Sequence, residues 1–121
     1  MIDASQINWN IIAVDFDGTL CENKYPKIGE PNEQIIAYIR GMKKLGARLI
    51  LWTCRAGKLL QDAVDWCGER GIVFDAVNEN LPDIIEYFGG DTRKAYAHEY
   101  IDDKNCKLFD LPYKAERGEI K

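Results

Sequence analysis

The chain has 121 residues, of which 46% are hydrophobic and 30% charged, and its formal net charge at pH 7 is -4. This length predicts one domain spanning residues 1–121 and is too short for two domains of ordinary size. The weak net charge, with basic and acidic residues intermixed, argues against general nucleic-acid binding and against binding to an anionic membrane surface.

Apolar runs alternate with amphipathic segments along the chain. The run at 10–16 is almost continuously apolar and ends in acidic residues, which is typical of a strand buried on both faces of a parallel sheet. In chain order, we predict strands at 10–16, 47–53, 72–77 and 100–102, a candidate fifth strand at 106–109, helices at 31–45, 57–70 and 81–88, and a polar tail at 115–121. This alternation predicts an α/β fold, a Rossmann-like three-layer sandwich with a mainly parallel central sheet.

The scattered cysteines and the lack of targeting signals in the sequence indicate where in the cell the protein is expected to reside. Four cysteines are scattered without a C-x-x-C pair and only one histidine is present, so a structural zinc site does not fit. The first ten residues lack the basic flank and apolar core of a signal peptide, and no apolar run is long enough to span a bilayer. We therefore expect a soluble cytoplasmic protein with reduced thiols and no membrane partner.

Polar residues cluster where each predicted strand ends. In parallel α/β sheets, ligands bind beyond the carboxyl ends of the strands, near the point where strand order reverses. The clusters that follow the first four strands are Asp15 with Asp17, Thr53 with Arg55, Asn78 with Asn80, and Asp102 with Asp103. We therefore expect them to converge on one crevice.

The four aspartates of these clusters predict a bound cation. Unless some of them take up protons, carboxylates gathered in one crevice repel one another, and hard oxygen ligands at a partly hydrated site suit Mg²⁺. Given the metal, one carboxylate of an Asp-x-Asp pair can attack phosphorus while the other donates a proton to the leaving oxygen. A lysine, the hydroxyl of Thr53 and backbone N–H groups after Asp15, beginning with that of Phe16, would stabilise the phosphoryl oxygens, and Gly18 would let the backbone turn around the anion.

Each of these residues also has a purely structural interpretation. An Asp-x-Asp pair often caps a helix or solvates a loop, Arg55 can cap a helix or form an ion pair, and the Asp102-Asp103 pair can form a turn. A Gly-Gly-Asp segment at 89–91 is a plain turn or a phosphate-binding loop. His98, Cys54 and the three tryptophans are assigned no role. The functional interpretation therefore depends on several clusters occupying equivalent strand ends.

The motifs resemble those of the haloacid dehalogenase-like (HAD) hydrolase superfamily over about residues 10–105. An apolar strand followed by Asp15-Phe16-Asp17-Gly18-Thr19-Leu20 is similar to the first motif of its phosphatases, and it is highly specific. Ile50-Leu51-Trp52-Thr53 resembles the second motif, and Tyr100-Ile101-Asp102-Asp103 resembles the fourth. The third motif is a single lysine or arginine.

The resemblance implies a role for each matching residue. Asp15 would be the nucleophile and a metal ligand, Asp17 the general acid/base and a ligand through its backbone carbonyl, and Thr53 a hydrogen-bond donor to the phosphate. Asp103 would complete the Mg²⁺ site, with Asp102 beside it as the alternative ligand. The phosphate-bound cation would be Lys94, with Lys58 and Arg55 as alternatives.

The family's usual cap domain has no room in this chain. Only ten residues (21–30) follow the first motif before the predicted helix, and 78–100 holds only a short helix and loops. The resemblance therefore implies an open crevice, which suits a phosphate on a large substrate such as a polynucleotide end or a protein, or a second copy of the chain covering the site. The substrate itself is not encoded in any motif.

Two other functional classes compete with a phosphatase. A catalytically idle HAD-like domain would bind a phosphorylated ligand or partner without turnover. A receiver-type signalling domain also phosphorylates an aspartate beside Mg²⁺, but it would place an acidic pair on the first strand and the acceptor aspartate on the third, where this chain has Asn78. The order of motifs thus favours a phosphohydrolase.

Overall fold

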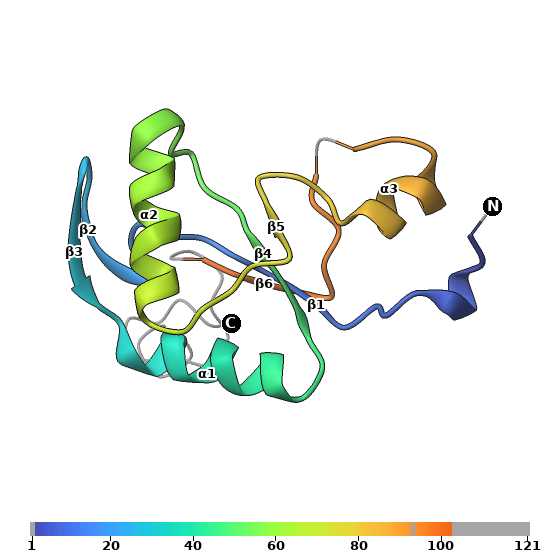
Figure 1. The fold of residues 1–121 in the computed structure, drawn as a ribbon, viewed down its shortest axis with the longest axis horizontal. Coiled ribbons are helices and arrows are strands. Elements are labelled where there is room, and N and C mark those ends of the chain that lie inside the picture. The colour runs from blue at the N-terminus through green and yellow to red at the C-terminus, as the bar shows by residue number, and fades with distance from the viewer. Residues whose placement is uncertain (1, 93, 103–121) are drawn as a thin grey trace, which may run out of the picture.

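The computed structural model describes residues 2–92 and 94–102 and has an α/β architecture (Figure 1). Four parallel strands form the central sheet in the order β5-β4-β1-β6, and a hairpin of β2 and β3 stands apart from it. The elements are η1 (Ala4–Gln6), β1 (Ile11–Val14), β2 (Cys21–Lys24), β3 (Lys27–Pro31), α1 (Glu33–Lys44), β4 (Arg48–Leu51), α2 (Gly57–Glu69), β5 (Ala76–Val77), α3 (Pro82–Phe88) and β6 (Glu99–Ile101).

Helices cover both faces of the sheet because successive residues of a strand point to opposite sides. Ile12 and Val14 of β1 join a core cluster with α1 and α2, whereas Ile11 and Ala13 join a second cluster with α3 and the N-terminal segment. All four β1 residues are buried. The predicted parallel sheet between helical layers is therefore confirmed.

The side chains at the ends of the helices explain most boundaries. Asn32 caps α1, its Oδ1 accepting from the Ile35 N–H at 3.4 Å, so α1 begins two residues later than the predicted start at 31. Lys43 and Lys44 lie in the last turn of α1, where they complement the helix dipole. The predicted helices at 57–70 and 81–88 are confirmed to within one residue as α2 and α3.

The predicted strand at 72–77 is wrong in length, since only Ala76 and Val77 pair with β4. The reason lies in Asp75, whose Oδ2 accepts the N–H of Leu49 at 2.8 Å and an Nζ–H of Lys43 at 2.6 Å. A side chain therefore occupies the donor of β4 that a longer backbone ladder would use. Val73, which counted toward the apolar run, is 66% exposed.

The segment 21–30, expected as a polar connection, forms most of the β2–β3 hairpin. It carries no apolar alternation because β2 buries only Cys21 and exposes its other three residues. A Cβ on Gly29 would lie 2.5 Å from the carbonyl oxygen of Glu22, so the close approach of the two strands requires glycine there. The candidate strand at 106–109, the tail at 115–121 and Asp103 lie outside the described residues.

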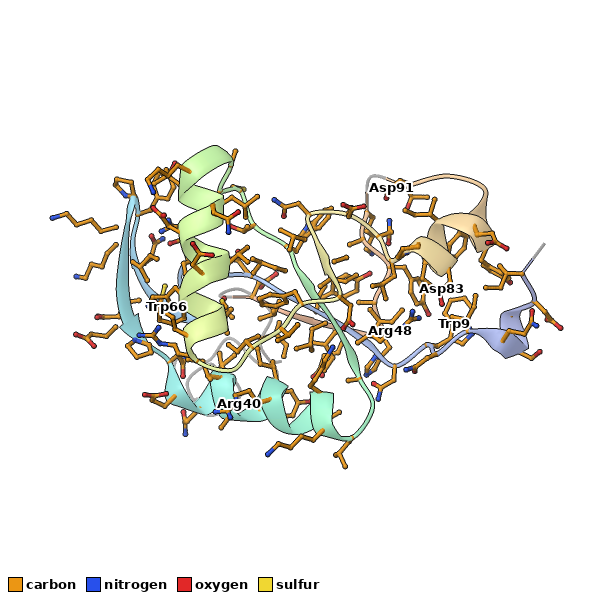
Figure 2. All side chains as sticks on the ribbon, viewed as in Figure 1. Trp9, Arg40, Arg48, Trp66, Asp83 and Asp91 are labelled. Atoms are coloured by element: carbon orange, nitrogen blue, oxygen red, sulfur yellow. The ribbon has the colours of Figure 1, made fainter. Side chains whose placement is uncertain are left out.

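The α3 layer is held to the sheet by one ion pair and an aromatic cluster. Arg48 of β4 donates from Nη1 to Asp83 Oδ1 of α3 at 3.0 Å, and Figure 2 shows the two side chains close to Trp9. The Trp9 ring makes edge contacts with Tyr87 and Tyr96, with centroids 5.3 and 5.2 Å apart. Within the described part of the chain, no helix combines the length and the apolar character needed to cross a membrane.

Ile39 tests the layer between α1 and the sheet. Its side chain is fully buried in the cluster that joins α1, α2 and β1. We expect Ile39→Ala to lower the free energy of unfolding by about 3 kcal/mol because it removes buried methyl groups and leaves a cavity. Urea denaturation measures the change, and Leu45→Ala, at a position 78% exposed, is the matched control. Equal losses in the two variants would contradict this packing.

Candidate functional site

A cavity of about 460 Å³ opens at the carboxyl ends of the sheet strands. The strand order places β1 between β4 and β6, so the chain crosses to opposite sides of β1 and the cavity lies at the switch point expected for ligands. Among the described residues, it is lined by Ala13, Asp15, Trp52, Thr53, Cys54, Asn78, Tyr100, Ile101 and Asp102.

Asp15 and Asp102 reach this cavity from neighbouring strands. Val14 pairs with Ile101, so the two aspartates are the next residues along two adjacent parallel strands. The N–H of Asp15 donates to the Ile101 carbonyl at 2.8 Å, which continues the ladder by one residue. Asp15 Oδ1 accepts the N–H of Phe16 at 2.8 Å. The structure therefore brings together one aspartate from each predicted acidic pair.

Thr53 enters the cavity beside them because Asn78 holds its backbone. Asn78 adopts a left-handed conformation, with φ of 54°, and its Oδ1 accepts the Thr53 N–H at 2.7 Å. Thr53 Oγ1 accepts the Arg55 N–H at 3.2 Å. Because a hydroxyl carries one donor besides its acceptor sites, the Thr53 O–H retains a proton to donate to a ligand.

Arg55 does not line the cavity, contrary to its prediction as a phosphate-binding cation. Its side chain is 1% exposed, and Nε and Nη2 each donate to an oxygen of Asp17 at 2.8 Å. The remaining N–H groups point to carbonyl oxygens of Pro26, Lys27 and Leu59 at 3.0 to 3.4 Å. All five donors of the guanidinium are thus used. The hydrogen bonds to Asp17 raise the pKa of Arg55 above its ordinary value, so it stays charged.

Asp17 consequently faces Arg55 and not the cavity. Arginine forks of this kind bind the ionised form of a carboxylate through two charge-assisted hydrogen bonds. The ring of Phe16 lies 5.0 Å from Arg55 Cζ, and the buried side chain belongs to the α1–α2 cluster. The side chains of Asp17 and Phe16 therefore anchor the backbone that follows Asp15, through Arg55 and the α1–α2 cluster.

Gly18 serves the turn and not a ligand in this arrangement. Its φ is 82°, a left-handed value that glycine adopts without strain, as predicted for a sharp turn. Its N–H donates to the Cys21 carbonyl at 2.9 Å, and the N–H of Phe16 is taken by Asp15. The predicted use of these two N–H groups for substrate binding would therefore require both bonds to exchange.

Lys94 contacts a residue of the cavity wall, whereas Lys58 is paired with Asp62 on α2. Lys94 Nζ is 5.4 Å from the ring centroid of Tyr100, which lines the cavity. Lys58 lies in the first turn of α2, where its Nζ forms an exposed ion pair with Asp62 at 3.1 Å. Of the three candidate cations, Lys94 is the one whose side-chain charge contacts a residue of the cavity wall among the contacts described above, since Arg55 reaches Thr53 only through its backbone N–H.

Asn80 fixes the loop that carries Lys94, a role that sequence reasoning missed. The side chain is 1% exposed, and its Nδ2 donates to Asp91 Oδ1 at 2.9 Å and to the Lys94 carbonyl at 3.4 Å. Its Oδ1 accepts the Tyr96 N–H at 2.6 Å. Figure 2 labels Asp91 in the loop after α3, while Gly89 ends that helix with φ of 80°. The segment 89–91 is therefore a helix end and turn. The sequence signal that could have pointed to Asn80 was its position as a polar residue just after a predicted strand.

Two of the predicted Mg²⁺ ligands, Asp15 and Asp102, line the cavity. Within residues 2–92 and 94–102, no three His, Cys, Asp or Glu side chains gather closely enough to hold a metal ion. Asp15 and Asp102 supply carboxylates to one cavity, the Asp17 carboxylate is bound by Arg55, and Asp103 is outside the described residues. Magnesium often binds through one or two carboxylates and retains several waters, so this pair fits it.

Comparison with known proteins adds one relationship. No protein-family model matches the chain, and no curated protein matches it significantly. A solved structure of a conserved protein from Bacteroides thetaiotaomicron is 36% identical, with a TM-score of 0.72 and coverage of 94% of both chains. The chain belongs to the same family as that protein. The relationship extends over almost the whole length of both chains, so the two share one domain architecture.

Arg55 should stabilise the fold more than any exposed cation does. We expect Arg55→Met to lower the free energy of unfolding by about 3 kcal/mol, because it leaves Asp17 partly buried without its partner and frees the hairpin carbonyls. Lys58→Met, which removes only an exposed ion pair, should leave the value nearly unchanged. Urea denaturation followed by circular dichroism measures the free energy of unfolding of both variants. An unchanged free energy of unfolding in Arg55→Met would refute the anchoring role.

Cysteine labelling tests exposure at the cavity. Cys54 is exposed and lines the cavity, whereas Cys21 and Cys67 are buried. Burial raises the pKa of Cys21 and raises that of Cys67 to about 12, which keeps both thiols protonated and unreactive at pH 8. We expect iodoacetamide at pH 8 to alkylate Cys54 well before those two, as measured by peptide mass spectrometry. Labelling in urea, where all thiols should react alike, is the control, and early alkylation of Cys67 would contradict the structure.

Proposed function

We propose that the chain is a magnesium-dependent phosphomonoester hydrolase of the HAD type in which Asp15 is the nucleophile. Support comes from one arrangement: Asp15 and Asp102 end neighbouring strands and face the same cavity as Thr53. The resemblance of the motifs around these residues supplies their roles. Asp103 is retained as the alternative metal ligand to Asp102.

The reaction would proceed in two displacements at phosphorus. A carboxylate oxygen of Asp15 attacks, the bond from phosphorus to the leaving oxygen breaks, and Asp17 gives that oxygen a proton. Water then attacks the aspartyl phosphate, Asp17 takes up a proton, and inorganic phosphate leaves with the Asp15 carboxylate restored. The Thr53 hydroxyl and Lys94 would hold the phosphoryl oxygens, and bound Mg²⁺ would offset the negative charge of carboxylates and phosphate.

Asp17 has to change partners for its part in this scheme. Both of its oxygens accept from Arg55 at 2.8 Å. Proton transfer to the leaving oxygen therefore requires Asp17 first to take up a proton from solvent and to give up at least one of these hydrogen bonds. The Arg55 contacts to the hairpin carbonyls would hold the guanidinium in place while Asp17 moves.

The same ion pair favours a second candidate function. A domain that keeps Asp17 bound to Arg55 would hold a phosphorylated ligand at Asp15 and Thr53 without turning it over. Such a protein would bind inorganic phosphate or a phosphomonoester saturably in the presence of Mg²⁺. It would release no product from any member of a broad panel of phosphate esters.

The proposed enzyme has no cap domain over its active-site cavity. The hairpin and α3 occupy the two chain segments in which a cap would be inserted. An open cavity would admit a phosphate on a large substrate, including a polynucleotide end or a protein, or would be covered by a second copy of the chain. We place this activity in the cytoplasm, where thiols stay reduced.

Phosphate release from 4-nitrophenyl phosphate tests the hydrolase directly. With Mg²⁺ present, we expect Asp15→Asn to lower kcat by about 10,000-fold or more, because an amide cannot act as the nucleophile. Asp62→Asn, which removes a partly exposed carboxylate on α2, should retain full activity. Acid-quenched wild-type protein should carry one phosphoryl group on the Asp15 peptide in mass spectrometry. Undiminished release by Asp15→Asn would overturn the assignment.

A further inference from the structure

A second cavity, of about 370 Å³, adjoins the first. Its walls are mainly aromatic rings and methyl groups, with one cation at the edge. The lining residues are Phe88, Thr92, Lys94, Ala95, Tyr96, Ala97 and Tyr100. Concave apolar sites of this size, with few polar groups, are typical of small-molecule binding.

Tyr100 is the wall that the two cavities share. Its hydroxyl donates to the Ala95 carbonyl at 2.5 Å and accepts the Ala97 N–H at 3.1 Å, so the ring is fixed at both its backbone and its tip. Lys94 Nζ lies over this ring, 5.4 Å from the centroid. The aromatic cavity therefore carries a positive charge over the one ring that it shares with the cavity of Asp15.

Hydrogen bonds and ring contacts within the protein hold the aromatic walls of this cavity. Tyr96 is held by the hydrogen bond from its N–H to Asn80 and by the edge contact with Trp9. Phe88 lies next to Tyr96, with centroids 6.0 Å apart, yet 50% of its surface is exposed. The Thr92 hydroxyl is occupied, since it donates to the Lys94 carbonyl at 2.8 Å. The cavity therefore offers stacking surface but few hydrogen bonds.

We propose that the aromatic cavity binds the leaving group of the substrate, and that the substrate is a phosphomonoester whose leaving group carries a planar ring next to the phosphate or one sugar away from it. This inference rests on the proposed placement of the phosphoryl group at Asp15 and Thr53. Lys94 would then lie between phosphate and ring. A sugar hydroxyl buried against Phe88 and Tyr96 would lose hydrogen bonds to water that these side chains cannot replace. A planar ring gains from stacking there instead.

Matched substrate pairs test the ring preference. Adenosine 5′-monophosphate differs from ribose 5-phosphate by a base one sugar away from the phosphate, and benzyl phosphate differs from ethyl phosphate by a ring close to it. We expect kcat/KM to be about tenfold or more higher for the ring-bearing member of at least one pair. The pair that shows the larger ratio identifies the spacing between phosphate and ring.

Phe88 variants locate the preference in this cavity. Phe88→Ala should lower the ring-to-no-ring ratio about tenfold while leaving the ring-free substrates nearly unaffected, and Phe88→Leu should lie between Phe88→Ala and wild type. Leu45→Ala, an exposed apolar residue on α1's end, is the matched control and should keep the wild-type ratio. Similar rates for both members of each pair, or an equal loss on all four substrates in Phe88→Ala, would overturn the inference.

A binding measurement separates failure of this inference from failure of the hydrolase. Phenylphosphonate and methylphosphonate are not hydrolysed, and calorimetry with Mg²⁺ gives their Kd values even if the protein turns nothing over. We expect phenylphosphonate to bind about tenfold more tightly, and Phe88→Ala to abolish that difference. Tighter ring binding without turnover would support the cavity and the binding domain. Equal affinities in this pair, and equal affinities of the non-hydrolysing Asp15→Asn variant for adenosine 5′-monophosphate and ribose 5-phosphate, would refute the cavity whether or not the protein is a hydrolase.

Discussion

The guanidinium of Arg55 is the contact on which the geometry around Asp15 depends. It binds both oxygens of Asp17, and its other donors reach carbonyl oxygens in the hairpin and in α2. Three segments that are distant in the chain therefore meet at one buried charge. A buried arginine is tolerated only where every donor is satisfied, so the turn after β1 cannot shift without disturbing the hairpin and α2 as well.

The parallel register of β4, β1 and β6 aligns the residues that follow these strands. Because Val14 pairs with both Leu51 and Ile101, the residues that follow three strands emerge at the same height. Asp15 and Asp102 thus meet through backbone geometry, and Thr53 joins them once Asn78 holds its N–H. Polar groups held on strand ends, and not on long loops, can bind a ligand with little conformational adjustment.

The sequence predicted those parts of the molecule that follow from buried periodicity. The strand at 10–16, the helices on both faces and the convergence of Asp15, Thr53 and Asp102 all depend on apolar patterns that one face or one register enforces. The β2–β3 hairpin was missed because its strands are largely exposed and carry no such pattern. The ion pair between Asp17 and Arg55 could not be predicted from the sequence, because it joins residues 38 positions apart through side-chain geometry alone.

The two-residue strand β5 also limits how this protein can associate with others. Among the described strands it lies at one edge of the sheet, and the side chain of Asp75 occupies the donor where a longer ladder would begin. A short edge offers few backbone groups to a strand from another molecule, which protects against edge-to-edge aggregation. At this edge, a second copy of the chain would find little backbone to extend the sheet, so any assembly formed here has to be built from side-chain contacts.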